Sequence, residues 1–207
     1  MAKLILSKSG LQKQRENMRL YERVLPSLEL KRMQLTAELK RAQEQCARSK
    51  ADAERLKQEA ARQLPMLADG EMDLLSLVEV EKIDVGEENM VGVRLPKLSG
   101  VSFRVASYSM LARPHWADVL ATRLKQMVSQ EVLVQVMAQR VFLLERAVRR
   151  ITQRTNLFEK ILIPEAKGNI RKIQIYLADA DRAAVIRSKI TKRIRQKQAE
   201  VFEGAAP

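Results

Sequence analysis

Aromatic residues, glycine and proline are all scarce in this chain of 207 residues. Phe, Trp and Tyr together make up 4% of the sequence, and there are 7 Gly and 6 Pro, although the hydrophobic content is an ordinary 46%. Compact cores usually draw on aromatic side chains, and tight turns draw on glycine and proline. The composition therefore favours long helices over a compact core of mixed elements.

Cysteine and long apolar runs are also missing. The only cysteine, Cys46, excludes an intramolecular disulfide and a cysteine-based metal cage, and fits a reducing compartment. No run approaches the roughly 18 apolar residues of a transmembrane helix, and the start "MAKLILSKSG" lacks the apolar region of a signal peptide. We therefore expect a cytoplasmic protein that reaches a membrane only through partners, with no direct membrane contact.

The sequence motifs of common active sites do not occur. There is no G-x-x-x-x-G-K-[ST], G-x-G-x-x-G, H-E-x-x-H, C-x-x-C or G-x-S-x-G. The lone His115 lies between Pro114 and Trp116 at an expected helix start, where capping or packing is a commoner role than catalysis. Asp179 and Asp181 are two residues apart and diverge on a helix. We predict a non-catalytic chain without cofactor or metal.

Acidic residues are too few to balance the basic ones. The chain has 38 Lys and Arg against 25 Asp and Glu, a formal charge of +13, and "RAAVIRSKITKRIRQK" (182–197) contains seven bases and no acid. On a helix, Ile186, Ile190 and Ile194 form one thin stripe, with cations around the rest of the circumference. A membrane-surface helix needs a broader apolar face with aromatic anchors, and single-stranded nucleic acid needs aromatics for stacking, so neither partner is favoured.

Proline and glycine divide the chain into two long arms and an insert. Four of the seven glycines fall between Pro65 and Pro114, whereas long stretches on either side contain neither residue. We predict an N-terminal coiled-coil arm over 1–65, a central acidic insert over 66–113 and a C-terminal coiled-coil arm with a basic end over 114–207.

Each arm carries one narrow stripe of apolar side chains, at alternating steps of three and four residues. The rest of its surface is Lys, Arg, Glu and Gln, so each stripe needs a single partner helix. We predict a mainly α fold: a long antiparallel two-helix coiled coil formed by the arms, with a small central β-hairpin. Pro26 and Pro164 should each kink or end a helix. The predicted core residues are Leu11, Met18, Leu28, Leu35, Leu39, Val141, Leu144, Val148, Ile151, Ile173 and Leu177.

The insert has the residue pattern of strands. "LVEVEKIDV" (77–85) alternates apolar and charged residues, "GEEN" (86–89) supplies turn chemistry, and "MVGVRLPKL" (90–98) is rich in β-branched residues. These stretches predict the β-hairpin, and residues 101–107 are expected to extend it. Residues 66–100 hold eight acids against three bases. The charge is therefore polarised between an acidic insert and basic chain ends.

Local strings, in this order, resemble the family of the D subunit of the V-type (archaeal and bacterial A/V-type) rotary ATPases, the central rotor shaft. Residues 139–194 resemble the C-terminal helix of that family, including its I-P step at Ile163 and Pro164 and its basic ending. "NMVGVRLPKL" (89–98) resembles the central hairpin. The matching positions are Arg140, Val141, Leu144 and Glu145 in the helix, and Asn89, Gly92, Val93 and Pro96 in the hairpin motif.

The resemblance implies a shaft whose paired termini insert into a hexamer of catalytic and regulatory subunits, A and B. The other end would bind the small rotor component F and sit on the socket component, C/d, above the membrane ring. Rotation would couple ATP hydrolysis or synthesis to proton or sodium translocation. Solvated, individually weak ion pairs would let a basic tip turn against acidic loops. The predicted tip residues are Lys3, Lys8, Lys13, Arg187, Lys189, Lys192, Arg193, Arg195 and Lys197.

Two other classes of protein share parts of this pattern. One is a related stalk, either the γ subunit of F-type enzymes or the coiled-coil stalk of the flagellar export ATPase. The first carries a larger α/β domain between its arms and the second lacks an acidic hairpin, so the insert favours the V-type shaft. The other is a basic coiled-coil protein that binds nucleic acid, whose binding would fall steeply with salt. Our prediction is that nucleic acid is not a partner.

Overall fold

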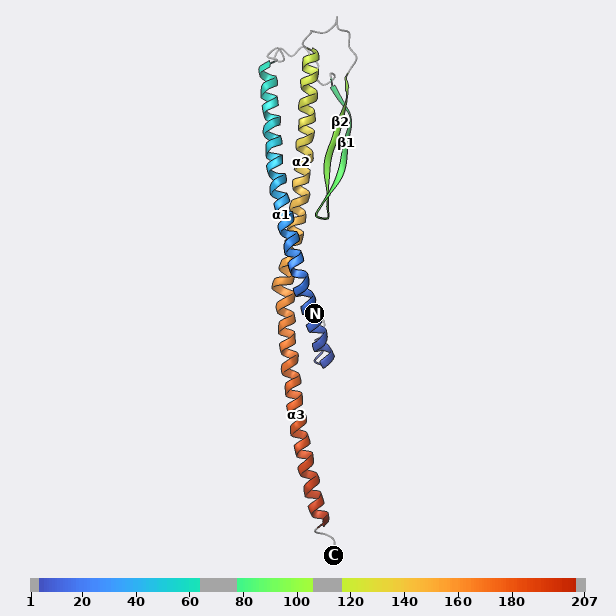
Figure 1. Cartoon of the computed structure of the whole chain (residues 1–207), viewed down its shortest axis with the longest axis vertical. Coiled ribbons are helices and arrows are strands. Elements are labelled where there is room, and N and C mark those ends of the chain that lie inside the picture. The colour runs from blue at the N-terminus through green and yellow to red at the C-terminus, as the bar shows by residue number, and fades with distance from the viewer. Residues whose placement is uncertain (1–3, 64–77, 106–116, 204–207) are drawn as a thin grey trace. The chain divides into compact units, whose positions relative to one another are not determined.

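The computed structural model describes residues 4–63, 78–105 and 117–203. Its described part is mainly helical, with one small antiparallel hairpin, as the sequence predicts (Figure 1). In chain order the elements are α1 (Lys8–Gln63), β1 (Val78–Met90), β2 (Val93–Val105), α2 (Ala117–Leu157), the π-helix η3 (Phe158–Leu162) and α3 (Ile163–Glu203).

The chain divides into two compact units. Unit 1 comprises Met1–Glu29 and Gln153–Pro207, and unit 2 comprises Leu30–Thr152. Each unit therefore contains part of α1 and part of the helices that follow the hairpin. The division into an N-terminal arm, an insert and a C-terminal arm stays a prediction about domains.

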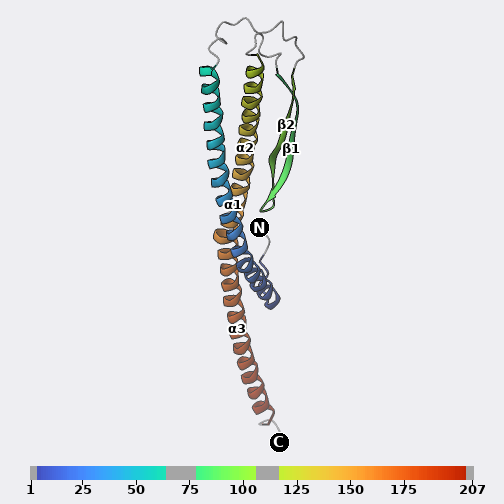
Figure 2. The same ribbon diagram turned by 45° about the horizontal axis from the view of Figure 1, so that its top comes forward.

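In unit 2, α1 packs along α2 through a seam of small side chains. Figures 1 and 2 both show the two helices side by side there. Buried α1 residues recur at steps of seven and four, the spacing of a coiled-coil seam. Since most of them are Ala or Cys, the two backbones can approach closely, and the core depends on helix contact more than on large side chains. These seam residues are Leu35, Ala42, Cys46, Ala53 and Ala60.

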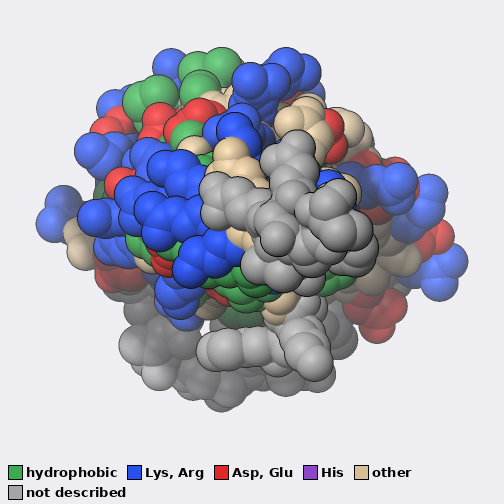
Figure 3. Space-filling model, turned by 90° about the horizontal axis from the view of Figure 1, so that it is seen from below, with side chains coloured by type: hydrophobic (Ala, Val, Ile, Leu, Met, Phe, Trp, Pro, Cys, Tyr) green, Lys and Arg blue, Asp and Glu red, His purple; other side chains and the backbone are tan. Residues whose placement is uncertain are grey.

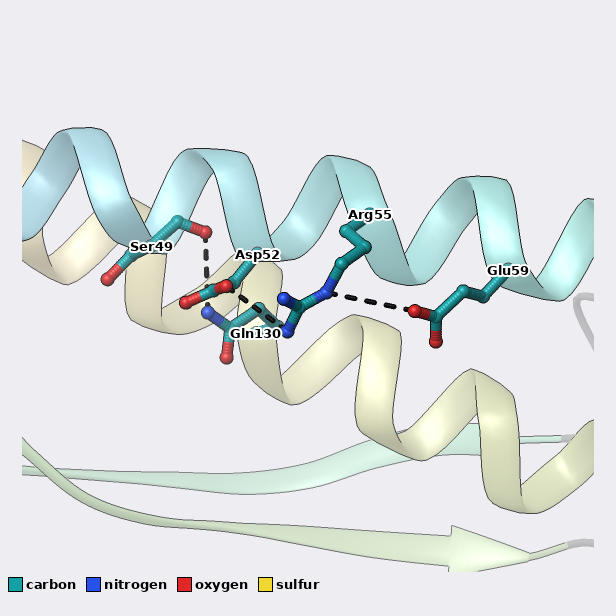
Figure 4. Close-up of polar contacts among 5 residues, drawn as sticks. All are labelled: Ser49, Asp52, Arg55, Glu59 and Gln130. Atoms are coloured by element: carbon teal, nitrogen blue, oxygen red, sulfur yellow. Dashed lines mark hydrogen bonds and ion pairs between the residues drawn. The ribbon is translucent and has the colours of Figure 1, made fainter.

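Polar contacts flank this seam without replacing it (Figure 4). The Gln130 side chain donates a 3.3 Å hydrogen bond to the Ser49 carbonyl, which joins α2 to α1. Arg55 lies between Asp52 at 3.3 Å and Glu59 at 3.7 Å, both on its own helix. These ion pairs are largely exposed, and such pairs contribute about 0–1 kcal/mol each. Apolar burial is therefore the main source of helix pairing.

The hairpin turns later than the sequence pattern predicted. The "GEEN" stretch, 86–89, was the predicted turn, and this prediction is wrong because all four residues pair with β2 inside β1. The chain reverses instead at Val91 and Gly92, whose φ angles are 52° and 78°. Two successive residues with positive φ are typical of the tight two-residue turn that matches strand twist. Residues 101–105 continue β2 and form no separate strand.

In unit 1, the start of α1 packs against η3 and α3. The rings of Tyr21 and Phe158 meet edge to face with centroids 5.5 Å apart. Thr155, Ala166 and Ile173 are buried, with exposed fractions of 0%, 3% and 0%. The core of unit 1 is therefore a thin helix-to-helix contact like that of unit 2.

The two helix prolines behave differently. α1 continues through Pro26, so this proline does not end the helix. Before Pro164 the chain forms η3, and the Ile163 N–H donates to the Phe158 carbonyl. A proline ring collides with the carbonyl four residues earlier, and one wider π-turn relieves that collision. Pro164 therefore changes the helix geometry and leaves the helix unbroken.

The eleven predicted core residues all lie in helices. Leu35, Leu144, Ile151 and Ile173 are buried, and the other seven are partly buried. A two-helix contact covers only one side of each helix, so partial burial is the usual state for its residues.

Candidate functional site

The end of α3 is a basic segment that no other described element covers. Every side chain from 178 to 197 is exposed, including Ile186, Ile190 and Ile194 at 58%, 52% and 51%. The view from below shows Lys and Arg side chains gathered in a broad group (Figure 3). We call residues 182–197 the basic end. It contains six of the predicted tip residues: Arg187, Lys189, Lys192, Arg193, Arg195 and Lys197.

The N-terminal tip residues lie at a different level of unit 1. Lys8 and Lys13 are exposed in the first turns of α1, and Lys3 lies outside the described residues. Met18 and Ile170 line one groove, so α1 and α3 run antiparallel from the Tyr21 contact. Figures 1 and 2 both show α3 extending well past the first turn of α1. The structure therefore does not bring Lys8 and Lys13 beside the basic end.

Local chemistry explains where α1 begins. The Ser7 hydroxyl accepts a 3.0 Å hydrogen bond from the Gly10 N–H, and the Ser7 carbonyl accepts one of 2.9 Å from the Leu11 N–H. Serine at this position caps a helix by satisfying a free backbone donor. A Cβ atom at Gly10 would collide with the Ile5 carbonyl, so glycine permits this close approach. Sequence reasoning missed both residues, although a serine immediately before a helical run is a usable signal.

Arg140 attaches the hairpin to α2 within unit 2. Its residue exposure is only 8%, and its Nη1 atom lies 3.2 Å from both Glu88 Oε2 and the Pro96 carbonyl. Leu95, which is 1% exposed, pairs with Glu88 across the hairpin. A buried guanidinium requires such partners, because an unpaired buried charge is very costly. One arginine therefore contacts both strands near the turn.

The predicted hairpin motif residues all lie around this turn. Gly92 supplies a positive φ, Val93 pairs with Met90, and Asn89 pairs with Arg94. Pro96 offers its carbonyl to Arg140. The motif is thus brought together by strand pairing, whereas the link to Arg140 had no local sequence signal.

The part of the hairpin farther from the turn has an open apolar face. Three facing pairs are apolar: Val80 with Phe103, Ile83 with Val101, and Val85 with Leu98. In a regular strand, residues three apart point to opposite faces. The irregularities at 80/82 and 84/85 each add one residue, so Val80 and Ile83, and likewise Leu98 and Val101, stay on the same face. Val80, Ile83 and Val85 are 42%, 45% and 49% exposed. We call these six residues the apolar hairpin face.

Charges around the hairpin are paired among themselves. Lys82 lies 2.6 Å from Asp84, Arg104 lies 3.6 Å from Glu81, and Arg94 is paired similarly. The Asp84 carboxylate, by accepting a hydrogen bond and by its charge, raises the pKa of Lys82 above its ordinary value. The hairpin therefore offers a partner apolar surface with little unbalanced charge.

Neither a metal site nor a membrane-spanning helix is found among the described residues. No group of three or more His, Cys, Asp or Glu in 4–63, 78–105 and 117–203 could hold a metal ion. Over the same ranges, no helix combines the length and apolar character needed to cross a membrane.

Comparison with known proteins decides the family. The family model for the D subunit of ATP synthase matches residues 10–193. The chain belongs to the ATP synthase D-subunit family. Similar proteins include the V-type ATP synthase D subunit of Borreliella burgdorferi, at 32% identity over 93% of this chain and 95% of the relative. The V-type ATP synthase D subunit of Chlamydia pneumoniae is 31% identical over 91% of each chain, and that of Chlamydia muridarum 32% over 94% and 97%.

The D-subunit match includes the features that the structure singles out. It contains the hairpin, Arg140 and most of the basic end, with Arg195 and Lys197 just beyond it. The resemblance seen in the sequence is thereby confirmed at the level of the family.

Proposed function

We propose that this chain is the central rotor shaft of a V-type ATPase/ATP synthase. By rotating, it couples ATP hydrolysis or synthesis in the catalytic hexamer to proton or sodium translocation. The observation that carries the proposal is the D-subunit match over 10–193, which includes both helical arms and the hairpin between them. In this role the chain contributes no catalytic residue, and nucleotide chemistry belongs to the A and B subunits of the hexamer.

The basic end would be the part that turns inside the hexamer. Its cations lie on an exposed helical segment that no other described element covers, so each can meet an acidic loop while keeping contact with water. Exposed pairs of this kind contribute about 0–1 kcal/mol each, too little to hold the shaft at one angle. The proposed hexamer contacts comprise the six cations of the basic end and, separately from it, three lysines near the N-terminus: Arg187, Lys189, Lys192, Arg193, Arg195 and Lys197, with Lys3, Lys8 and Lys13.

The hairpin would bind the partners that lie outside the hexamer. Its apolar face and paired charges suit a stable contact with another rotor component. We assign this contact to the small rotor component F. The socket component C/d is the second partner at this end of the shaft. The chain would be cytoplasmic and peripheral to the membrane through the complex.

Charge reversal tests the role of the basic end. We expect Arg187→Glu, Lys192→Glu and Arg195→Glu together to weaken docking into the hexamer and to lower ATP-driven ion pumping in membrane vesicles. The matched control reverses three other exposed cations in one helix of unit 2, Arg41→Glu, Arg48→Glu and Lys50→Glu.

Three outcomes are informative. Loss of docking and pumping in the first variant alone supports the proposal. Unchanged assembly and pumping in that variant contradicts the role of the basic end. A wild-type chain that copurifies with nucleic acid in a steeply salt-dependent way, and not with a hexamer, overturns the shaft function itself.

A further inference from the structure

A second basic surface lies on unit 1, away from the basic end. Between α1 and α3 there is an open groove with a volume of about 270 Å³. Two partly buried apolar side chains, Met18 and Ile170, contribute to it, together with three exposed cations. We call it the inter-helix groove, and its lining residues are Arg15, Met18, Arg19, Lys167 and Ile170.

The charge of the groove is poorly balanced by the chain itself. The one ion pair that involves its cations among the described residues joins Lys167 Nζ to Glu22 at 3.8 Å, with both side chains about half exposed. A long, exposed pair of this kind is weak and exchanges readily for another carboxylate. Arg15 and Arg19 are one helical turn apart on α1, so both guanidinium groups can reach the same bound group.

The apolar part of the groove restricts what can bind. Met18 has a flexible, polarisable side chain that adapts to the shape of a partner. A nucleic acid strand would need aromatic side chains for base stacking, and no aromatic residue is among the described residues that line the groove. A cationic rim around apolar side chains is instead complementary to a protein segment that presents one apolar side chain between carboxylates.

We propose that the inter-helix groove seats an acidic, apolar-tipped segment of a hexamer subunit, in addition to the contacts of the basic end. This inference rests on the proposed shaft function. The groove belongs to unit 1, the unit that carries the basic end, whereas the hairpin assigned to the other partners belongs to unit 2. The groove differs from the basic end because side chains of two helices, α1 and α3, line it, so a bound segment contacts both helices and can define a preferred angle.

The test compares two triple variants of the full chain for binding to the shaft-free A/B hexamer. Arg15→Gln, Arg19→Gln and Lys167→Gln remove the groove cations. Arg23→Gln, Arg171→Gln and Lys172→Gln are the matched control, because they remove three exposed cations from the same two helices outside the groove. We expect the groove variant to bind roughly tenfold more weakly and the control to change less than about twofold.

A third variant, Met18→Ser, separates shape from charge. It leaves all groove cations in place, and we expect it also to weaken binding, which a purely electrostatic surface would not show. Thermal unfolding of each variant, followed by circular dichroism, checks that the helices remain folded.

The outcomes distinguish this inference from the function on which it rests. Equal losses in the groove and control variants, or no loss with Met18→Ser, overturn the groove while the shaft function stands. Failure of the wild-type chain to bind the hexamer overturns the shaft function first. Salt-sensitive binding of an oligonucleotide that the groove variant alone loses would replace the acidic segment with nucleic acid and overturn the proposal.

Discussion

Arg140 is the one buried charged side chain in the described part of the chain, and its surroundings illustrate how a single residue positions an element. Its Nη1 atom serves both Glu88 and the Pro96 carbonyl, while its Nε atom has no hydrogen-bond partner among the described residues. The carboxylate of Glu88 therefore provides most of the interaction energy that offsets the cost of burying the guanidinium charge. Losing that carboxylate leaves a buried cation without a counter-charge.

Glu88→Gln tests this dependence. The Glu88 side chain is 40% exposed, so solvent screens part of the pair, and we expect a loss of about 1–2 kcal/mol in the free energy of unfolding. Hydrogen exchange at the hairpin amides should accelerate in parallel. The control is Glu87→Gln, because Glu87 pairs with Arg94 at 3.8 Å with both side chains over 70% exposed. Similar effects in both variants would show that Arg140 does not depend on Glu88.

At the scale of elements, the α1 seam is a heptad pattern that uses mainly small residues. Cys46 and three alanines occupy core positions at which coiled coils commonly have leucine. The sequence predicted one narrow stripe along this helix, with Leu35 among its core residues, since periodicity follows directly from helix geometry. It could not predict how closely α2 approaches, because that distance depends on side chains of both helices.

Ala53→Leu tests the close approach in the seam. Ala53 is 6% exposed, so the added side chain has no space, and we expect a loss of about 1–3 kcal/mol in the free energy of unfolding. Ala51→Leu, at an exposed position two residues earlier, is the control and should change stability by less than about 0.5 kcal/mol. Urea unfolding measures both. A neutral Ala53→Leu would mean that the helices separate easily.

The hairpin shows where local patterns mislead. "GEEN" has good turn residues, yet the turn forms at Val91 and Gly92, because facing pairs along thirteen-residue strands outweigh the turn preference of a short stretch. The contact between Arg140 and Glu88 joins residues 52 positions apart, and no local pattern encodes it. The basic end, in contrast, could be predicted from the sequence, because a run of exposed charges is a local feature that does not depend on contacts with distant residues.

At the scale of the whole molecule, the excess positive charge of +13 is unevenly distributed between surfaces. Hairpin acids and bases pair with one another, whereas the basic end and the inter-helix groove keep most of their cations without acidic partners within the described part of the chain. A partner at the hairpin would therefore bind mainly through apolar contact, and a partner at the basic end mainly through charge.

Salt should separate these two kinds of contact. We expect the affinity of the chain for the hexamer to fall as ionic strength rises from about 0.05 to 0.5 M, because salt screens exposed charge pairs. Binding of the small rotor component should change much less, since burial of apolar surface is not weakened by screening. Calorimetry at both ionic strengths measures the two affinities with one preparation. Equal salt dependence would contradict the assignment of the surfaces.

The sequence by itself determined the helical arms, the apolar stripes, the hairpin as a class of element and the basic end. Each follows from residue periodicity or charge within a short segment, which local backbone geometry and solvation largely control. Only the tertiary structure decided the turn at Val91 and Gly92, the burial of Arg140, the apolar hairpin face and the groove between α1 and α3. These features depend on which distant residues meet, and on how closely two elements can pack, neither of which a local pattern specifies.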